Sequence, residues 1–194
     1  MTNIFKEGSK VFGMHLAFMM IALVFMPTFG FLLDGNIGRK VYALITGFLA
    51  LSAAYSVAWK AGRKDERYAI SQNKHIPAGE QALSCNRRKG LWIGLIGSIP
   101  TIAALVVYIY AWQGGTDTEF YAYVNMAYRI YHSAFLGFLG DDNLTYIWNC
   151  VIVTCIVPLL CTAAYVAGIK QFSVSEWLMP RVLYKKKKDQ SAKG

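Results

Sequence analysis

Four long runs of apolar residues set the strongest limit on how this chain can fold. They cover residues 11–33, 41–59, 91–112 and 146–169. The hydrocarbon core of a bilayer is about 30 Å thick, and a helix needs about 20 apolar residues to cross it. Each run is close to or above that length. The pattern predicts an all-α integral membrane protein with four transmembrane helices, arranged as two hairpins in a single membrane domain over residues 1–194.

The charged residues favour the same interpretation because they lie mainly between the apolar runs. They make up 16% of the chain, whereas a soluble domain usually has about a quarter. The first run follows Lys6 and Lys10, as the apolar part of a signal peptide would. It is longer than the roughly 7–15 residues of such a part, so we expect it to remain as a membrane span.

The distribution of basic residues predicts the orientation of the spans. Of the 20 lysines and arginines, two precede the first run, eight lie in residues 60–90 and seven lie in residues 170–194. Cytoplasmic segments of membrane proteins are enriched in these residues. Both termini, the loop 60–90 and the tail 170–194 are therefore predicted to be cytoplasmic. Only Arg39, Lys40 and Arg129 would then lie outside.

The net charge of +9 points to lipid rather than to nucleic acid. Basic residues next to membrane spans meet the anionic inner leaflet, which attracts each of them by about 1 kcal/mol. The expected partners are thus the lipid bilayer, with anionic lipids on the cytoplasmic side. The candidate lipid contacts are Arg87, Arg88, Lys185, Lys186, Lys187 and Lys188. The chain length, the lysine-rich tail and the cysteine usage suggest a bacterial cytoplasmic membrane.

The first predicted outer loop carries a candidate catalytic motif. Asp34 begins the pattern Asp-Gly-x-x-Gly-Arg, which is followed by Gly47. This stretch resembles part of the signature of the CDP-alcohol phosphotransferases, membrane enzymes that hold divalent metal with four aspartates. That signature would place the other three aspartates where this chain has Phe31, Leu51 and Tyr55. Because hard divalent cations need several oxygen ligands, we interpret the stretch as a turn and predict no metal site.

Small residues follow one face of two predicted spans. At helical spacing these are Gly47 and Ala54 in the second span, and Gly90, Gly94 and Gly97 at the third. Small side chains let helix backbones approach closely, which matters because lipid gives no hydrophobic drive for helix association. We expect these stripes to pack the bundle internally, with docking of a partner protein as the alternative.

The predicted outer segment, residues 113–145, has helical periodicity over 118–139. Its apolar face comprises Phe120, Val124, Tyr128, Tyr131, Phe135 and Phe138. Asn125, Arg129 and His132 fall on the other face. A fifth span here would bury Arg129 in hydrocarbon, at a cost of about 2.5–3.5 kcal/mol, and would export the basic tail. We therefore expect an amphipathic helix lying in the outer membrane interface.

Three roles remain open for this helix: packing on the membrane, docking a partner, or covering a cavity between the spans as a lid. The candidate interface residues are Phe120, Tyr128, Arg129, Tyr131, His132 and Phe135.

The predicted spans contain few side chains that could catalyse a reaction. His15 is expected near the inner end of the first span, and no Asp, Glu, Lys or Arg is expected at mid-membrane. Proton relays and pathways for charged substrates normally need such a residue. Intramembrane hydrolases need paired carboxylates, a metal-binding cluster or a nucleophile with its base. We therefore expect no catalytic residues, no cofactor and no enzymatic activity.

Two functions fit these observations. The first is a non-catalytic accessory or scaffold subunit that binds another membrane protein or a second copy of itself. The second is a small transporter or substrate-binding membrane component for a neutral or aromatic compound. A polar, water-reachable cavity under the outer helix would favour the second, and a solidly packed bundle would favour the first.

Overall fold

A computed structural model of the chain describes residues 2–32, 35–75, 83–116, 118–139 and 144–172. Every regular element in these ranges is helical. The elements are α1 (Ile4–Leu32), α2 (Gly35–Asn73), α3 (Lys89–Gln113), α4 (Glu119–Tyr131), η1 (Ser133–Phe135), α5 (Leu136–Leu139) and α6 (Leu144–Ile169). Helices α1, α2, α3 and α6 are long and apolar enough to cross a membrane. The prediction of an all-helical chain with four such helices is confirmed.

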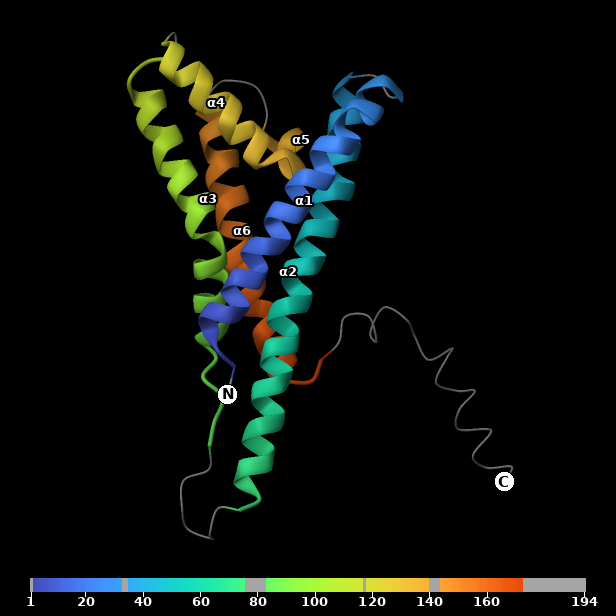
Figure 1. The fold of residues 1–194 in the computed structure, drawn as a ribbon, viewed down its shortest axis with the longest axis vertical. Coiled ribbons are helices and arrows are strands. Elements are labelled where there is room, and N and C mark those ends of the chain that lie inside the picture. The colour runs from blue at the N-terminus through green and yellow to red at the C-terminus, as the bar shows by residue number, and fades with distance from the viewer. Residues whose placement is uncertain (1, 33–34, 76–82, 117, 140–143, 173–194) are drawn as a thin grey trace, which may run out of the picture.

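The four long helices form a bundle in which α1 and α6 each pack along both α2 and α3. They diverge toward one end, where α4 and α5 lie across the opening (Figure 1). We call this the α4 end. At the opposite end, the N-terminus, the start of α3 and the end of α6 lie beside α2, which extends beyond them (Figure 1). It carries the basic residues of 60–67 and 87–89, and we call it the basic end.

Glycines allow α3 to approach its neighbours closely. A methyl group at Gly94 would lie 2.6 Å from the Cα atom of Pro158 in α6. A methyl group at Gly97 would lie 2.7 Å from the Cβ atom of Val11 in α1. Both distances are shorter than any real carbon–carbon contact, so only glycine permits this packing. The stripe of small residues on α3 therefore lies between helices of the bundle.

The same holds for small residues nearer the basic end. Ala54 and Ala58 of α2 are buried in one apolar cluster with Tyr165 of α6. A methyl group at Gly90 of α3 would lie 2.6 Å from the Cβ atom of Tyr165. Close approach of backbones supplies van der Waals contact that lipid cannot replace.

Asp65 connects all four long helices at the basic end. Its side chain is 2% exposed. The backbone N–H and the hydroxyl of Thr2, just before α1, donate hydrogen bonds to its Oδ1 atom. The Lys89 ammonium of α3 lies 2.8 Å from Oδ2, and the Tyr165 hydroxyl of α6 donates to the same oxygen at 2.7 Å.

These hydrogen bonds keep the Asp65 carboxyl ionised. Burial alone would raise its pKa, but hydrogen bonds from Lys89, Thr2 and Tyr165 outweigh burial and lower the pKa to about 2. The carboxylate lies beyond Trp59, where the apolar run of α2 ends. It therefore acts as a polar clamp next to the apolar part of the bundle.

Helix α2 extends far beyond its apolar run. It has 39 residues, which corresponds to a length of about 58 Å. The segment 60–90, expected to be a loop, is helical as far as Asn73. Hydrophobicity falls after Trp59 because the apolar run ends there, but the helix itself continues to Asn73.

Candidate binding site at the α4 end

The segment after α3 turns back into the bundle. The Thr118 side chain caps α4 by accepting a hydrogen bond from the backbone N–H of Tyr121 at 3.2 Å. Helix α4 ends at Tyr131, and the chain turns at His132 before η1 and α5. The single helix expected over residues 118–139 is thus broken at His132, which lets the chain enter the space between α1 and α2.

Two side-chain hydrogen bonds hold this turn in place. The Ser133 hydroxyl donates to the backbone carbonyl of Met19 in α1 at 3.1 Å. The Thr46 hydroxyl of α2 donates to the carbonyl of Ala134 at 2.7 Å. Residues 132–135 are all buried. The turn is therefore part of the bundle interior.

The expected division of this segment into a lipid face and a polar face needs correction. Tyr128 and Phe135, expected against lipid, are buried inside the protein, and the Phe135 ring lies over Gly47 of α2. His132, expected on the polar face, is also fully buried. Phe120, at the start of α4, is 52% exposed. Because several helices surround the segment, no single stripe separates its buried from its exposed residues.

The end of α4 reaches half-way down the bundle. The Tyr131 hydroxyl lies 3.5 Å from that of Thr101, which is the middle residue of α3. At 1.5 Å per residue, Thr101 is roughly 18 Å from either end of α3. The segment therefore enters the bundle deeply instead of lying only across its end.

His15 meets this segment in the middle of α1. The ring centroids of His15 and His132 are 5.9 Å apart, and both rings contact Tyr131. Among the described residues, the Nε2 atom of neither histidine has a hydrogen-bond partner. A cavity of about 20 Å³ beside His15 has room for one water molecule.

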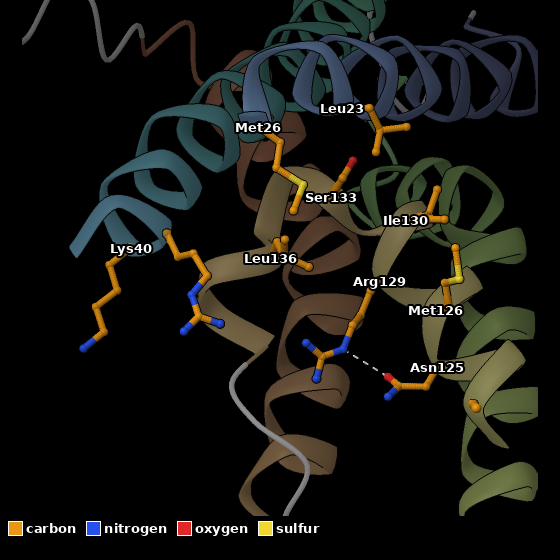
Figure 2. A pocket seen from close by; sticks show the side chains of 12 residues that line it. Leu23, Met26, Lys40, Asn125, Met126, Arg129, Ile130, Ser133 and Leu136 are labelled. Carbon is orange, nitrogen blue, oxygen red and sulfur yellow. Dashed lines mark hydrogen bonds between the residues drawn. The ribbon is translucent and has the colours of Figure 1, made fainter. Parts of the chain in front are cut away.

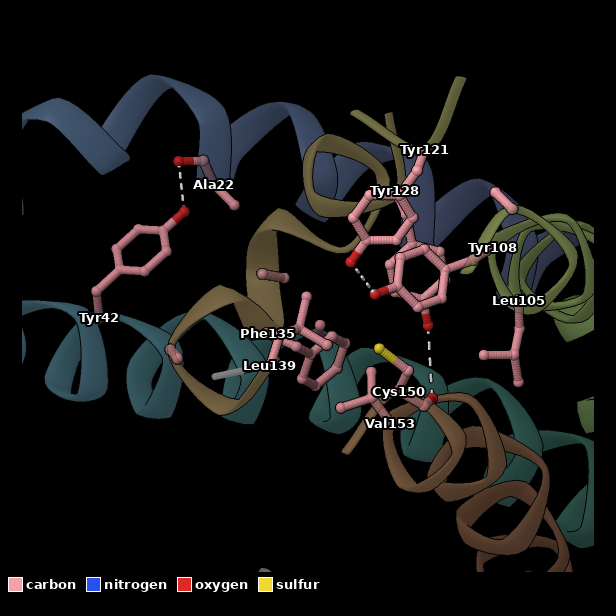
Figure 3. Packing of buried hydrophobic residues seen from close by; sticks show 14 residues of the cluster. Ala22, Tyr42, Leu105, Tyr108, Tyr121, Tyr128, Phe135, Leu139, Cys150 and Val153 are labelled. Atoms are coloured by element: carbon pink, nitrogen blue, oxygen red, sulfur yellow. Dashed lines mark hydrogen bonds between the residues drawn. The ribbon is translucent and has the colours of Figure 1, made fainter. Parts of the chain in front are cut away.

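Tyrosines fix α4 to α3 and α6 (Figure 3). The Tyr128 ring stacks on His132 with centroids 4.2 Å apart and lies 4.9 Å from that of Tyr108 in α3. The Tyr108 and Tyr121 hydroxyls are 3.0 Å apart. The Tyr128 hydroxyl donates to the carbonyl of Cys150 in α6 at 3.5 Å. Buried tyrosines pack through their rings while their hydroxyls find partners, so they hold α4 in a defined position.

A half-open pocket of about 690 Å³ lies beside α4 (Figure 2). Its lining comes from α1, α2, α4, η1 and α5, and we call it the α4 pocket. Three cationic side chains line it: Arg39, Lys40 and Arg129. Neither Arg39 nor Lys40 was predicted as a site residue, because the sequence predicts only that they lie on the same side of the membrane as Arg129 and not that they lie beside it.

Close packing of α5 on α2 forms one wall of the α4 pocket. Gly137, which lines the pocket, lies so close to α2 that a methyl group there would overlap the carbonyl oxygen of Arg39. On the opposite wall, the Arg129 Nε–H donates to the Asn125 side-chain oxygen at 3.1 Å (Figure 2). The first contact fixes the backbone of Arg39, and the second holds the side chain of Arg129.

Two further hollows are present. An apolar one of about 410 Å³ lies between α2, α5 and α6, where Asn149 is its one polar side chain among the described residues. A basic one of about 250 Å³ is formed on α2 by Trp59, Lys60, Arg63, Lys64 and Arg67. The candidate lipid contacts Arg87 and Arg88 are exposed before α3. Lys185, Lys186, Lys187 and Lys188 lie outside the described residues.

The described part of the chain has no group of three His, Cys, Asp or Glu side chains that could hold a metal ion. Comparison with protein-family models, curated proteins and solved structures finds no significant match. The properties of the α4 pocket itself must therefore indicate its role.

Proposed function

We propose that this protein is a non-catalytic, ligand-binding component of a membrane, and that the α4 pocket holds its ligand. The supporting observation is that the segment after α3 folds into the bundle and forms one wall of this pocket. Small-molecule sites are usually hollows of roughly 300–1,000 Å³ with apolar walls and a few placed polar groups. The α4 pocket has that size and that mixture.

We further propose that the α4 end faces the outside and the basic end faces the cytoplasm. The excess of lysine and arginine at the basic end supports this orientation through the positive-inside rule. In this orientation the α4 pocket opens at the outer face of the membrane. Both termini are then cytoplasmic, and anionic lipids of the inner leaflet meet the basic end.

The close packing of the helices favours a binding component over a complete carrier. Between the α4 pocket and the basic end, the helices approach closely at Gly94 and Gly97, and Asp65 clamps the basic end. The cavity beside His15 has room for only about one water molecule. We therefore propose that the protein binds its ligand at the α4 end and works with a larger membrane protein or a second copy.

Filling the α4 pocket tests this function. Ala122 lines the pocket and is exposed, so Ala122→Trp places a large ring in it. Ala103 is also exposed, on α3, but does not line the pocket, which makes Ala103→Trp a matched control. We expect native mass spectrometry after gentle extraction to find a bound small molecule on the wild type and the control, and none on Ala122→Trp.

Two results would contradict the proposed function. One is a wild-type protein that carries no small molecule, with a stoichiometric protein partner pointing to a scaffold instead. The other is the same bound molecule on all three proteins, which would place it elsewhere.

A further inference from the structure

We propose that the basic hollow on α2 binds one phospholipid whose headgroup carries two phosphates. The hollow has a volume of about 250 Å³ and is lined by Trp59, Lys60, Arg63, Lys64 and Arg67. It shares no lining residue with the α4 pocket, so the inference goes beyond the proposed function. General attraction of basic residues to an anionic leaflet needs no defined site, whereas this hollow is a site for a single lipid.

The four cations of the hollow occupy one face of α2. They stand at positions i, i+3, i+4 and i+7, which are neighbours on the surface of a helix. Lys60, Lys64 and Arg67 are exposed, and Arg63 is partly buried. The three exposed side chains make no hydrogen bond or ion pair with other residues in the described ranges. They are therefore available to an anion from outside the protein.

The acidic residues of the same stretch of α2 have other partners. Asp65 is 2% exposed and pairs with Lys89 inside the bundle. The Cys85 thiol donates a hydrogen bond to the Glu66 carboxylate at 3.4 Å. No Asp or Glu is among the described residues that line the hollow. The four cations therefore repel each other, and an anion between them replaces repulsion by attraction.

Helix α6 and the residues after it hold this part of α2 in place. A methyl group at Gly168 of α6 would overlap the carbonyl oxygen of Trp59, so the two backbones are in direct contact. The Trp59 Nε1–H donates to the carbonyl of Phe172 at 2.7 Å. The Arg63 guanidinium lies 5.1 Å from the centre of the Trp59 ring, in a cation–π pair. Because these contacts fix the ring and the arginine, binding requires little reorganisation of the hollow.

The hollow lies at the depth of lipid headgroups. Trp59 ends the apolar run of α2, and tryptophan is enriched at membrane interfaces. The headgroup region on each side of the hydrocarbon core is roughly 5–8 Å thick. At 1.5 Å per residue, Lys64 lies about 6 Å beyond Lys60 along α2. A phospholipid in the leaflet at the basic end can therefore place its headgroup among these cations while its chains remain in the hydrocarbon core.

The number of cations favours a headgroup with two phosphates. A phosphate diester carries one negative charge, so a lipid with a single phosphate would balance only one of the four cations. Arg63 and Arg67 can each bind a phosphate through two oxygens, and lysines add compact positive charges. A soluble diphosphate would match the charges equally well, but only a lipid is held at this depth by its chains.

The test is native mass spectrometry of the full chain in detergent, titrated with cardiolipin, a phospholipid with two phosphates. We expect the first cardiolipin to bind more tightly than further copies, phosphatidylglycerol or phosphatidylcholine. Replacing the exposed cations (Lys60→Gln, Lys64→Gln and Arg67→Gln together) should weaken the affinity for this first cardiolipin about tenfold or more. Arg63 stays unchanged in this variant because it also packs on Trp59.

A matched variant controls for net charge. Lys74→Gln, Arg87→Gln and Arg88→Gln together remove the same charge at exposed positions outside the hollow, and should leave the affinity unchanged. Equal loss of affinity in the two triple variants would mean that basic residues act only by general attraction, and would overturn the inference. A variant with Lys60→Arg and Lys64→Arg keeps the charge and should retain binding, which separates loss of binding from loss of folding.

Two further probes test the ligand class. Equal affinities for cardiolipin and phosphatidylglycerol would contradict a headgroup with two phosphates. Pyrophosphate carries two phosphates without chains, and we expect it to leave cardiolipin bound when both are present at the same concentration. Displacement of cardiolipin by pyrophosphate would identify a soluble anion instead of a lipid.

Failure of this inference is distinguishable from failure of the proposed function. Ala122→Trp changes the α4 pocket and should bind cardiolipin as the wild type does. A bound molecule that the variant with Lys60→Gln, Lys64→Gln and Arg67→Gln loses, and that Ala122→Trp retains, belongs to the basic hollow. A bound molecule with the opposite response belongs to the α4 pocket.

Discussion

At the scale of single residues, the buried polar groups of the bundle are of two kinds. Asp65 has hydrogen bonds from three different residues and lies among four helices. His132 is fully buried and His15 is partly buried, yet their Nε2 atoms have no partner in the described part of the chain. A fully bonded buried group stabilises one arrangement of helices, whereas an unbonded one costs stability. Asp65 therefore stabilises the packing at the basic end, whereas the two histidines lower stability near the middle of the bundle.

The Asp65→Asn substitution measures this contribution. A pKa lowered from 3.8 to about 2 corresponds to roughly 2 kcal/mol of stability at neutral pH. We expect the variant to unfold at a lower temperature than the wild type near neutral pH. Because the folded pKa lies below the unfolded one, this contribution is present above the unfolded value and is lost as the pH falls through about 2.

The pH dependence of the difference in unfolding temperature shows whether Asp65 acts through its charge. The gap in unfolding temperature between wild type and Asp65→Asn should be constant above about pH 5 and should shrink as the pH falls from 4 toward 2. Thermal unfolding in detergent, followed by circular dichroism, measures both proteins. A gap that stays the same at low pH would show that Asp65 does not act through its charge.

At the scale of elements, local sequence predicted the four long helices but not the path between α3 and α6. Apolar runs and helical periodicity are local properties, so they are visible along the chain. The fold-back depends on contacts such as Ser133 with Met19 and Thr46 with Ala134, which are 114 and 88 positions apart. Periodicity carries no information about such pairs. For the same reason, Arg129 was found as a candidate residue but its neighbours Arg39 and Lys40 were not.

Two glycines test the contact of α5 with α2. A methyl group at Gly137 would overlap the Arg39 carbonyl, whereas one at Gly13 in α1 would meet nothing within 4 Å. Alanine is favoured over glycine in helices by about 1 kcal/mol, so Gly13→Ala should be neutral or stabilising. We expect Gly137→Ala to lower the unfolding temperature and to reduce the amount of small molecule that native mass spectrometry finds bound to the protein. Equal stability of the two variants would mean that α5 does not pack against α2 in this way.

At the scale of the whole molecule, the two ends differ in construction. The basic end has close helix contacts and the Asp65 clamp. The α4 end is wider, and the segment after α3 enters it to form a pocket (Figure 1). Binding sites that open at one face of a membrane need this asymmetry, because one end must admit the ligand while the other maintains the bundle. The insertion of η1 between α1 and α2 is what the proposed function depends on most.

Labelling of single cysteines in intact cells with a membrane-impermeant maleimide tests that insertion and the orientation together. Tyr123 is 72% exposed on α4, and Ser133 is 1% exposed in η1. The wild type should stay unlabelled, because Cys85 lies toward the basic end and Cys150, Cys155 and Cys161 lie along α6. We expect Tyr123→Cys to be labelled from outside and Ser133→Cys to be protected. Labelling of both would place the segment on the surface of the membrane, and labelling of neither would contradict an outward-facing α4 end.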